Sequence, residues 1–245
     1  FFFKQKTAYE ILTCDWSSDV CSSDLMLPAL PLIMATPMQD RTLYAALGSG
    51  VLLALICSAV APYDRATWLL EVAPVLIAAP LLIWSHRRFP LTHLLYWVIA
   101  IHALVLILGG TYTYARVPPG FWVQDWFDLA RNPYDKLGHF IQGVTPALLA
   151  REVLLRRRFI AGGKMLGFLA LCVALAFSAF YELIEWWVAL IAGQGAEDFL
   201  GTQGDPWDTQ SDMLMALIGA GLSVTLLARI QDKHIAQLER SGRAE

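Results

Sequence analysis

The sequence predicts an all-α membrane protein, a polytopic bundle of about six transmembrane helices with both termini in the cytoplasm. The chain is 57% hydrophobic and only 16% charged, and its mean hydropathy of +0.51 is far from that of an ordinary soluble domain. Nine Trp and eight Tyr are typical of a protein with an aromatic belt at each membrane interface. No β-barrel alternation appears, so helices must satisfy the backbone within the bilayer.

The first 25 residues are left out of the fold prediction. Residues 1–25 closely resemble the translation of a sequencing adapter, contain no initiator Met, and lack the apolar stretch that a signal peptide would place after its lysines. We therefore interpret Met26 as the initiator methionine of the protein. The predicted domains are then a cytoplasmic segment at 26–41, a membrane domain at 42–228 and a cytoplasmic tail at 229–245.

Six apolar runs follow in the membrane domain, each near the about 20 residues that cross the hydrocarbon core. One buried soluble helix of this apolarity is conceivable, but six in succession indicate membrane spans. We find no internal repeat, which disfavours a transporter built from inverted repeats. The predicted spans are 42–60, 67–84, 94–112, 137–154, 165–189 and 211–228.

The basic residues predict the orientation, because cytoplasmic links carry an excess of Lys and Arg. Alternate links and the tail hold eleven of them: Arg87, Arg88, Arg151, Arg156, Arg157, Arg158, Lys164, Arg229, Lys233, Arg240 and Arg243. The opposite links hold four: Arg65, Arg116, Arg131 and Lys136. This bias places both termini in the cytoplasm and the long links 113–136 and 190–210 outside.

Three helices are expected to bring polar side chains to the same depth near the outer membrane boundary. Asp135 and His139 are four residues apart, so on a helix they share one face about 6 Å apart along the axis. A helix running outward from Lys164 reaches the boundary about 20 residues later, near Glu182 and Glu185. The last span begins with the Asp208 and Asp212 pair, and this convergence predicts a site.

Structural explanations exist for several of these residues. Asp135 and Lys136 can mark the membrane interface, where charges are tolerated. Asp205, which precedes a proline, is expected to be a helix N-cap. Glu71 and His102 lie within the second and third spans, and either joins the cluster or hydrogen-bonds a neighbouring helix. Carboxylates inside a membrane, however, usually face partners or a cavity.

The excess of carboxylates predicts either raised pKa values or a bound cation. Oxygen ligands with one imidazole suit Mn, Mg or Zn, and a bound ion can activate water with a carboxylate as general base. The predicted metal ligands are Asp135, His139, Glu185, Asp208 and Asp212. The predicted catalytic residues are Glu182 and Lys136, with Lys136 contacting an anionic group such as a phosphate.

We therefore hypothesise that the protein acts on an envelope or lipid-linked small molecule. Its other expected partner is the lipid bilayer. Two alternatives stay open: a proton- or ion-coupled small transporter, and a membrane protein in which the cluster is a structural polar lock. The net charge of −3 implies no nucleic-acid partner.

Three stretches form long motifs: Arg131-Asn-Pro-Tyr-Asp-Lys-Leu-Gly-His-Phe-Ile-Gln-Gly, Tyr181-Glu-Leu-Ile-Glu-Trp and Gly201-Thr-Gln-Gly-Asp-Pro-Trp-Asp-Thr-Gln-Ser-Asp-Met. With them, roughly residues 45–232 are similar to the YjdF-like family of predicted bacterial inner-membrane proteins. The resemblance implies an inner-membrane location and the topology above, and it assigns no activity.

A more distant likeness is to VanZ-like membrane proteins, which carry an Asp-Lys-x-x-His-Phe helix start, a later Glu and paired Asp before a Gly-rich last helix. The matching positions are Asp135, Lys136, His139, Phe140, Glu185, Asp208, Asp212 and Gly219. This likeness implies a connection with the cell envelope or with glycopeptide tolerance. Trp186 and Trp187 stand where that family tends to place a Gln-containing segment. We therefore transfer the matching site residues to this chain, but not the link to glycopeptide tolerance.

Overall fold

The structure is a computed structural model and describes residues 37–193 and 197–241. The interpretation of residues 1–25, the start at Met26 and most of the predicted segment 26–41 lie outside the described residues.

Six long helices confirm the all-α prediction, and no strand occurs within the described ranges. Five of the predicted spans lie inside one helix each, and the sixth runs past the end of its helix. The long helices are α2 (Pro37–Val60), α3 (Arg65–His86), α4 (His93–Tyr112), α6 (Tyr134–Arg156), α7 (Lys164–Ala192) and α9 (Asp208–Leu222).

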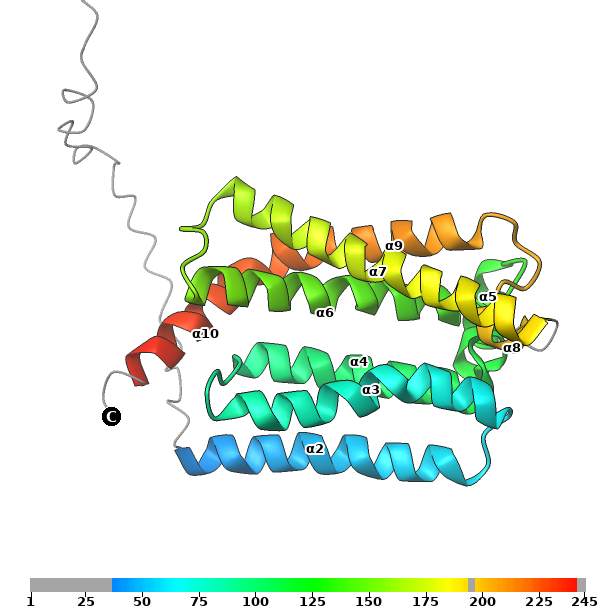
Figure 1. The fold of residues 1–245 in the computed structure, drawn as a ribbon, viewed down its shortest axis with the longest axis horizontal. Helices are drawn as coiled ribbons and strands as arrows, with labels where there is room; N and C mark the ends of the chain where they lie inside the picture. The colour runs from blue at the N-terminus through cyan, green and yellow to red at the C-terminus, as the bar shows by residue number, and fades with distance from the viewer. Residues whose placement is uncertain (1–36, 194–196, 242–245) are drawn as a thin grey trace, which may run out of the picture. The chain divides into compact units, whose positions relative to one another are not determined.

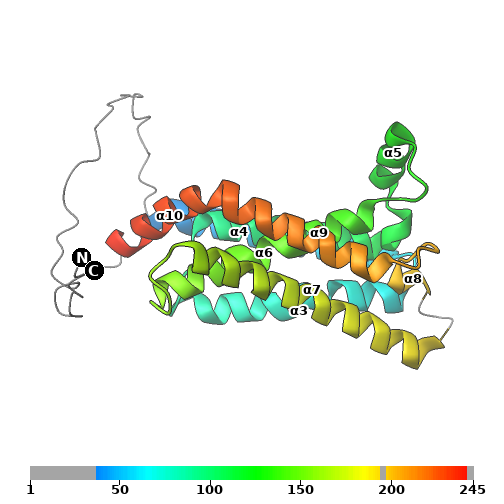
Figure 2. The same ribbon diagram turned by 90° about the horizontal axis from the view of Figure 1, so that it is seen from above.

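Shorter helices complete the fold. They are η1 (Tyr114–Arg116), α5 (Pro118–Phe127), α8 (Glu197–Leu200), the π-helical η3 (Ser223–Leu227) and α10 (Ala228–Ser241). The first three lie in predicted links, η3 lies at the end of the predicted span 211–228, and α10 lies in the predicted tail. The chain therefore remains helical from α9 through η3 into α10, with no break at the predicted boundary between membrane domain and tail. In Figure 2, α5 stands away from the long helices.

The long helices form two groups that meet along α4 and α6 (Figure 1). Helix α4 packs against α2 and α3, and α6 packs against α7 and α9. The turns between α3 and α4 and between α6 and α7 lie at the same end as α10 (Figure 1), which agrees with the predicted alternation of the links. Which end faces the cytoplasm stays a prediction.

Among the residues that the structure describes, five helical stretches are long and apolar enough to cross a membrane. They are Arg41–Val60, Arg65–His86, His93–Tyr112, Lys164–Ile191 and Asp208–Arg240. Helix α6 has 23 residues, a sufficient length, but it carries charged residues near both ends. Because α6 packs against α4, α7 and α9, its neighbours shield it from lipid, and its polar residues face protein.

The helix starts have different local causes. Asp64 caps α3, because its Oδ1 accepts a hydrogen bond from the Thr67 backbone N–H at 2.7 Å, and this bond lowers the pKa of Asp64. The prediction that Asp205 caps the last span is wrong. Trp207 is the N-cap of α9, and Asp205 instead accepts the Trp207 N–H and pairs with Arg131.

Two glycines allow α6 and α9 to touch backbone to backbone. A Cβ atom at Gly143 would collide with the backbone of Ala216, and a Cβ atom at Gly219 would collide with the carbonyl oxygen of Phe140. Small residues at such crossings permit close packing of membrane helices. Both positions lie within about three turns of the polar residues that begin α6 and α9, so this crossing fixes the distance between those residues.

A buried charged network joins the far end of α6 to α4 and α10. Glu152, fully buried, accepts hydrogen bonds from the Thr92 N–H at 2.9 Å and from Arg156 at 2.7 Å. Arg151 donates to Gln231 at 3.0 Å and to Asp232 at 2.7 Å. Arg151 and Arg156, which from the sequence indicate only the topology, therefore also connect helices.

We expect Gly219→Ala to lower the free energy of unfolding by about 2 kcal/mol, because the added methyl group must push α9 away from the Phe140 carbonyl. Gly221→Ala is the matched control on the same helix, since a Cβ atom there meets nothing within 4 Å. Thermal unfolding of the purified variants in detergent measures the difference. Equal midpoints for the two variants would contradict the tight crossing.

Candidate functional site

The central feature of the site is His139, which lies between carboxylates from three helices. Its Nε2 atom is 3.6 Å from Asp135 Oδ1 on α6 and 3.9 Å from Asp212 Oδ1 on α9. One donor atom from each of these three buried residues lies within 4.8 Å of the others. The four-residue spacing of Asp135 and His139 therefore places them on one face, as predicted.

The other ring nitrogen of His139 faces α7 and its own helix. Its Nδ1 atom is 2.9 Å from Gln142 Oε1 and 3.7 Å from Glu182 Oε1. The Glu182 side chain is 6% exposed, and its Oε1 atom is buried without a hydrogen-bond partner. A buried carboxylate oxygen without a hydrogen-bond partner is costly unless a proton, a water molecule or an ion satisfies it.

Two cations hold the acidic start of α9. Lys136 Nζ lies 2.8 Å from Asp208 Oδ1, 2.6 Å from Asp212 Oδ1 and 2.6 Å from the Ser211 hydroxyl. Arg131 pairs with Asp208 at 2.6 Å and with Asp205 at 2.9 Å. Asp208 is therefore already bound by two cations, whereas Asp212 shares Lys136 and also approaches His139.

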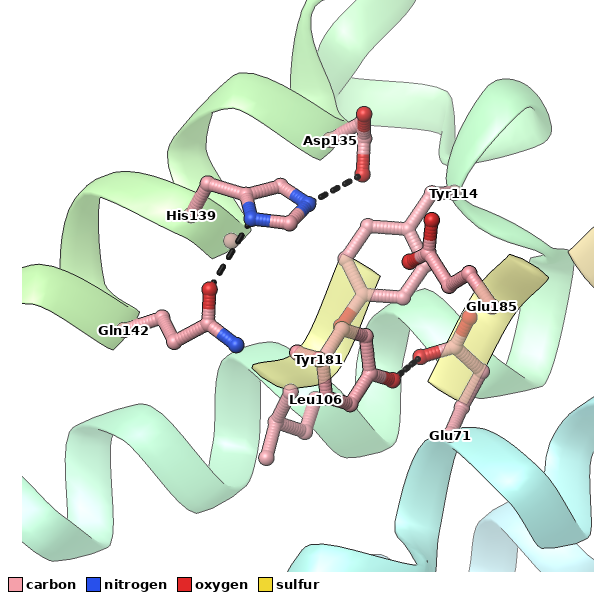
Figure 3. Close-up of a pocket in the computed structure, with 9 residues that line it drawn as sticks. Glu71, Leu106, Tyr114, Asp135, His139, Gln142, Tyr181 and Glu185 are labelled. Carbon is pink, nitrogen blue, oxygen red and sulfur yellow. Dashed lines mark hydrogen bonds and ion pairs between the residues drawn. The ribbon is translucent and has the colours of Figure 1, made fainter. Parts of the chain in front are cut away.

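A small cavity adjoins His139 on the side of α3 (Figure 3). Its volume is about 20 Å³, enough for one water molecule. Asp135 and His139 line it together with Glu71, Glu185 and the aromatic residues Tyr114 and Tyr181. Tyr181 donates its hydroxyl to Glu71 at 3.1 Å.

Tyr114 closes part of this cavity from η1. Its side chain is buried, and burial, together with the nearby Glu71 carboxylate, raises the pKa of Tyr114 well above its ordinary value. The phenol therefore stays protonated and can donate a hydrogen bond into the cavity.

The structure brings most of the predicted site residues together, but not as one equivalent set. Asp135, His139 and Asp212 form the group of donor atoms, with Glu182 beside them. Glu185 lines the cavity with Glu71 and is outside that group. Asp208 contacts Arg131 and Lys136. Because Lys136 also contacts Asp212, it bridges the two aspartates of α9.

From the sequence, the roles of Glu71 and His102 stayed open, and three residues of the site were not predicted. Glu71 joins the cavity, while His102 Nε2 is buried without a hydrogen-bond partner. Gln142, Tyr181 and Tyr114 were not singled out. Gln142 lies three residues after His139 and therefore on the same helical face, a spacing that could have indicated it. The role of Tyr114 depends on a turn whose conformation the sequence does not reveal.

Replacing Lys136 with Met should destabilise the protein by about 3 kcal/mol, because Asp212 would remain buried without its cation. Adding Asp212→Asn to this variant should restore part of the loss, since the uncompensated charge is then removed. Lys233→Met, at an exposed position on α10, is the control. Unfolding of the wild type, Lys136→Met, Asp212→Asn and the double variant in the same detergent gives a double-mutant cycle, with the control measured beside it. A Lys136→Met variant as stable as the control would contradict the pairing.

The comparisons with known proteins agree on one family. The family described as "Predicted membrane protein (DUF2238)" matches residues 43–233. The chain is 60% identical over 212 residues to "Inner membrane protein YjdF" of Escherichia coli (strain K12), a match that covers 86% of this chain and 95% of that protein. No solved structure matches the chain, and the likeness to VanZ-like proteins stays a prediction. The YjdF-like resemblance is thus confirmed, and the chain belongs to this DUF2238 family of membrane proteins and is itself a multi-pass protein of the bacterial inner membrane.

Proposed function

We propose that this inner-membrane protein binds a divalent metal ion at Asp135, His139 and Asp212 and acts on an envelope or lipid-linked substrate. The observation that supports the proposal best is the group of three buried donor atoms within 4.8 Å of one another. A second, independent observation is the buried Glu182 Oε1 atom beside the same imidazole, which has no hydrogen-bond partner.

The donor set suits a hard or borderline divalent ion, that is Mn, Mg or Zn. Gln142 Oε1 lies 2.9 Å from His139 Nδ1, and the tautomer protonated at Nδ1 would satisfy this contact and leave Nε2 available as a ligand beside the aspartates. With metal–ligand distances of about 2.1 Å, tetrahedral geometry places neighbouring donors about 3.4 Å apart. The two distances from His139 Nε2 to the aspartates, 3.6 and 3.9 Å, need contractions of only a few tenths of an ångström, and the aspartate donor atoms lie within 4.8 Å of each other.

Glu182 is the proposed general base, because its free oxygen lies next to His139 without being one of the three ligands. A metal ion in this position would lower the pKa of a bound water molecule, and the adjoining cavity has room for one. Lys136, with 19% of its side chain exposed, is the proposed contact for an anionic substrate group such as a phosphate.

The cavity itself favours the second candidate, a proton- or ion-coupled small transporter. It places the carboxylates of Glu71, Glu185 and Asp135 around the same small volume, next to an imidazole. Chains of such groups carry protons in membrane transporters. This alternative predicts that Glu185→Gln abolishes proton uptake into liposomes while metal content is unchanged.

We expect the purified protein to carry about one divalent ion per chain, and His139→Gln combined with Asp212→Asn to reduce that content at least tenfold, since two of the three ligands are lost. Asp128→Asn, at an exposed position between α5 and α6, is the matched control. Inductively coupled plasma mass spectrometry measures the metal, and circular dichroism verifies folding.

The separate variant Glu182→Gln should retain the metal but lose substrate turnover, because it removes the proposed base and no ligand. Undiminished metal in the His139/Asp212 double variant would exclude the proposed metal site.

A further inference from the structure

A second and larger cavity lies at the opposite end of α6 from His139. Its volume is about 550 Å³, within the range of sites that hold small molecules. It opens between the last turns of α6, the α6–α7 turn, the first turns of α7, and the η3–α10 segment. The proposed metal site does not use it.

The cavity presents positive charge from two elements. Arg151 and Lys164 line it, with Asp232 as the one acidic side chain among its lining residues. Asp232 is bound by Arg151 at 2.7 Å, so these two charges compensate each other. Lys164 is exposed and makes no salt bridge in the part of the chain that the structure describes, so the cavity retains a net positive charge.

The backbone adds further donors on the same side. Gly162 and Gly163 line the cavity with φ angles of 120° and 81°, and Gly163 precedes α7 without a side-chain cap. The first N–H groups of a 29-residue helix therefore lie beside Lys164 with no side chain bound to them. Uncapped N–H groups beside a cation favour a phosphate-like anion.

The remaining lining is apolar and borders the lipid-facing surface. Leu155, Leu166 and Val224 contribute to the cavity wall. Met165 and Phe168, at the start of the same membrane helix, are 58% and 61% exposed. A ligand here would meet cations at one end and hydrocarbon at the other, as the headgroup region of a lipid does.

We propose that this cavity binds the phosphate-bearing headgroup of an anionic phospholipid. The charge of the cavity selects the headgroup, and the apolar surface of α7 continues the site toward the acyl chains. Basic pockets between membrane helices are a recognised form of lipid site, and the inference holds whichever end of the bundle faces the cytoplasm.

The test uses the full-length protein in detergent with three probes: phosphatidylglycerol, phosphatidylcholine and inorganic phosphate. Phosphatidylglycerol should raise the thermal midpoint and appear as bound lipid in native mass spectra, because a ligand that binds only the folded state stabilises it. Lys164→Gln should weaken its apparent affinity about fivefold, the effect of one basic residue near an anionic headgroup. Ala161→Trp, at an exposed position of the lining, should block binding by filling the cavity.

Lys233→Gln is the control, because Lys233 is exposed at the same basic end but does not line the cavity. Equal losses in Lys164→Gln and Lys233→Gln would overturn the proposal, since they would indicate attraction to the surface as a whole. An equal shift with phosphatidylcholine or with phosphate alone would overturn the assignment to an anionic lipid. Retained binding in Ala161→Trp would exclude this cavity.

Discussion

The contact of Lys136 with Asp208 and Asp212 is the interaction on which the arrangement of the N-terminal half of α6 depends. It joins α6 to α9 through three hydrogen bonds of 2.6 to 2.8 Å, including the one to Ser211. Without this cation, the largely buried carboxylates of Asp208 and Asp212 would face a third carboxylate, that of Asp135, with no positive charge between them. With it, α9 approaches closely enough for Asp212 to reach His139.

Helix α6 carries these charges because other helices cover it. At its far end, Glu152 and Arg151 connect it to α4 and α10, and between the two polar ends Gly143 and Gly219 let it touch α9 directly. Charged side chains are costly in hydrocarbon, so they concentrate on the helix that has protein neighbours. The surrounding helices supply the apolar surface that faces lipid.

The sequence predicted the six long helices well, because apolar runs of about 20 residues have one explanation in a bilayer. It also predicted that Asp135, His139 and Asp212 meet, from helical spacing and a shared depth. Glu185 was predicted as a metal ligand and Glu182 as a catalytic residue, but helical spacing alone does not determine which of the two faces His139. These two residues lie on neighbouring parts of one helical face, and only the rotation of α7, set by packing, directs one to His139 and the other to the Glu71 cavity.

The balance of charge at this site supports both functional proposals, a bound cation and bound protons. Four carboxylates surround His139 and the start of α9, those of Asp135, Glu182, Asp208 and Asp212, and they face two cations, Lys136 and Arg131. About two negative charges therefore remain in a buried setting, where unpaired charge is expensive. One divalent ion removes the excess, and so do two protons. The metal and proton-coupled proposals are thus two solutions to the same imbalance, and the position of His139 Nε2, 3.6 and 3.9 Å from the two aspartates, favours the metal.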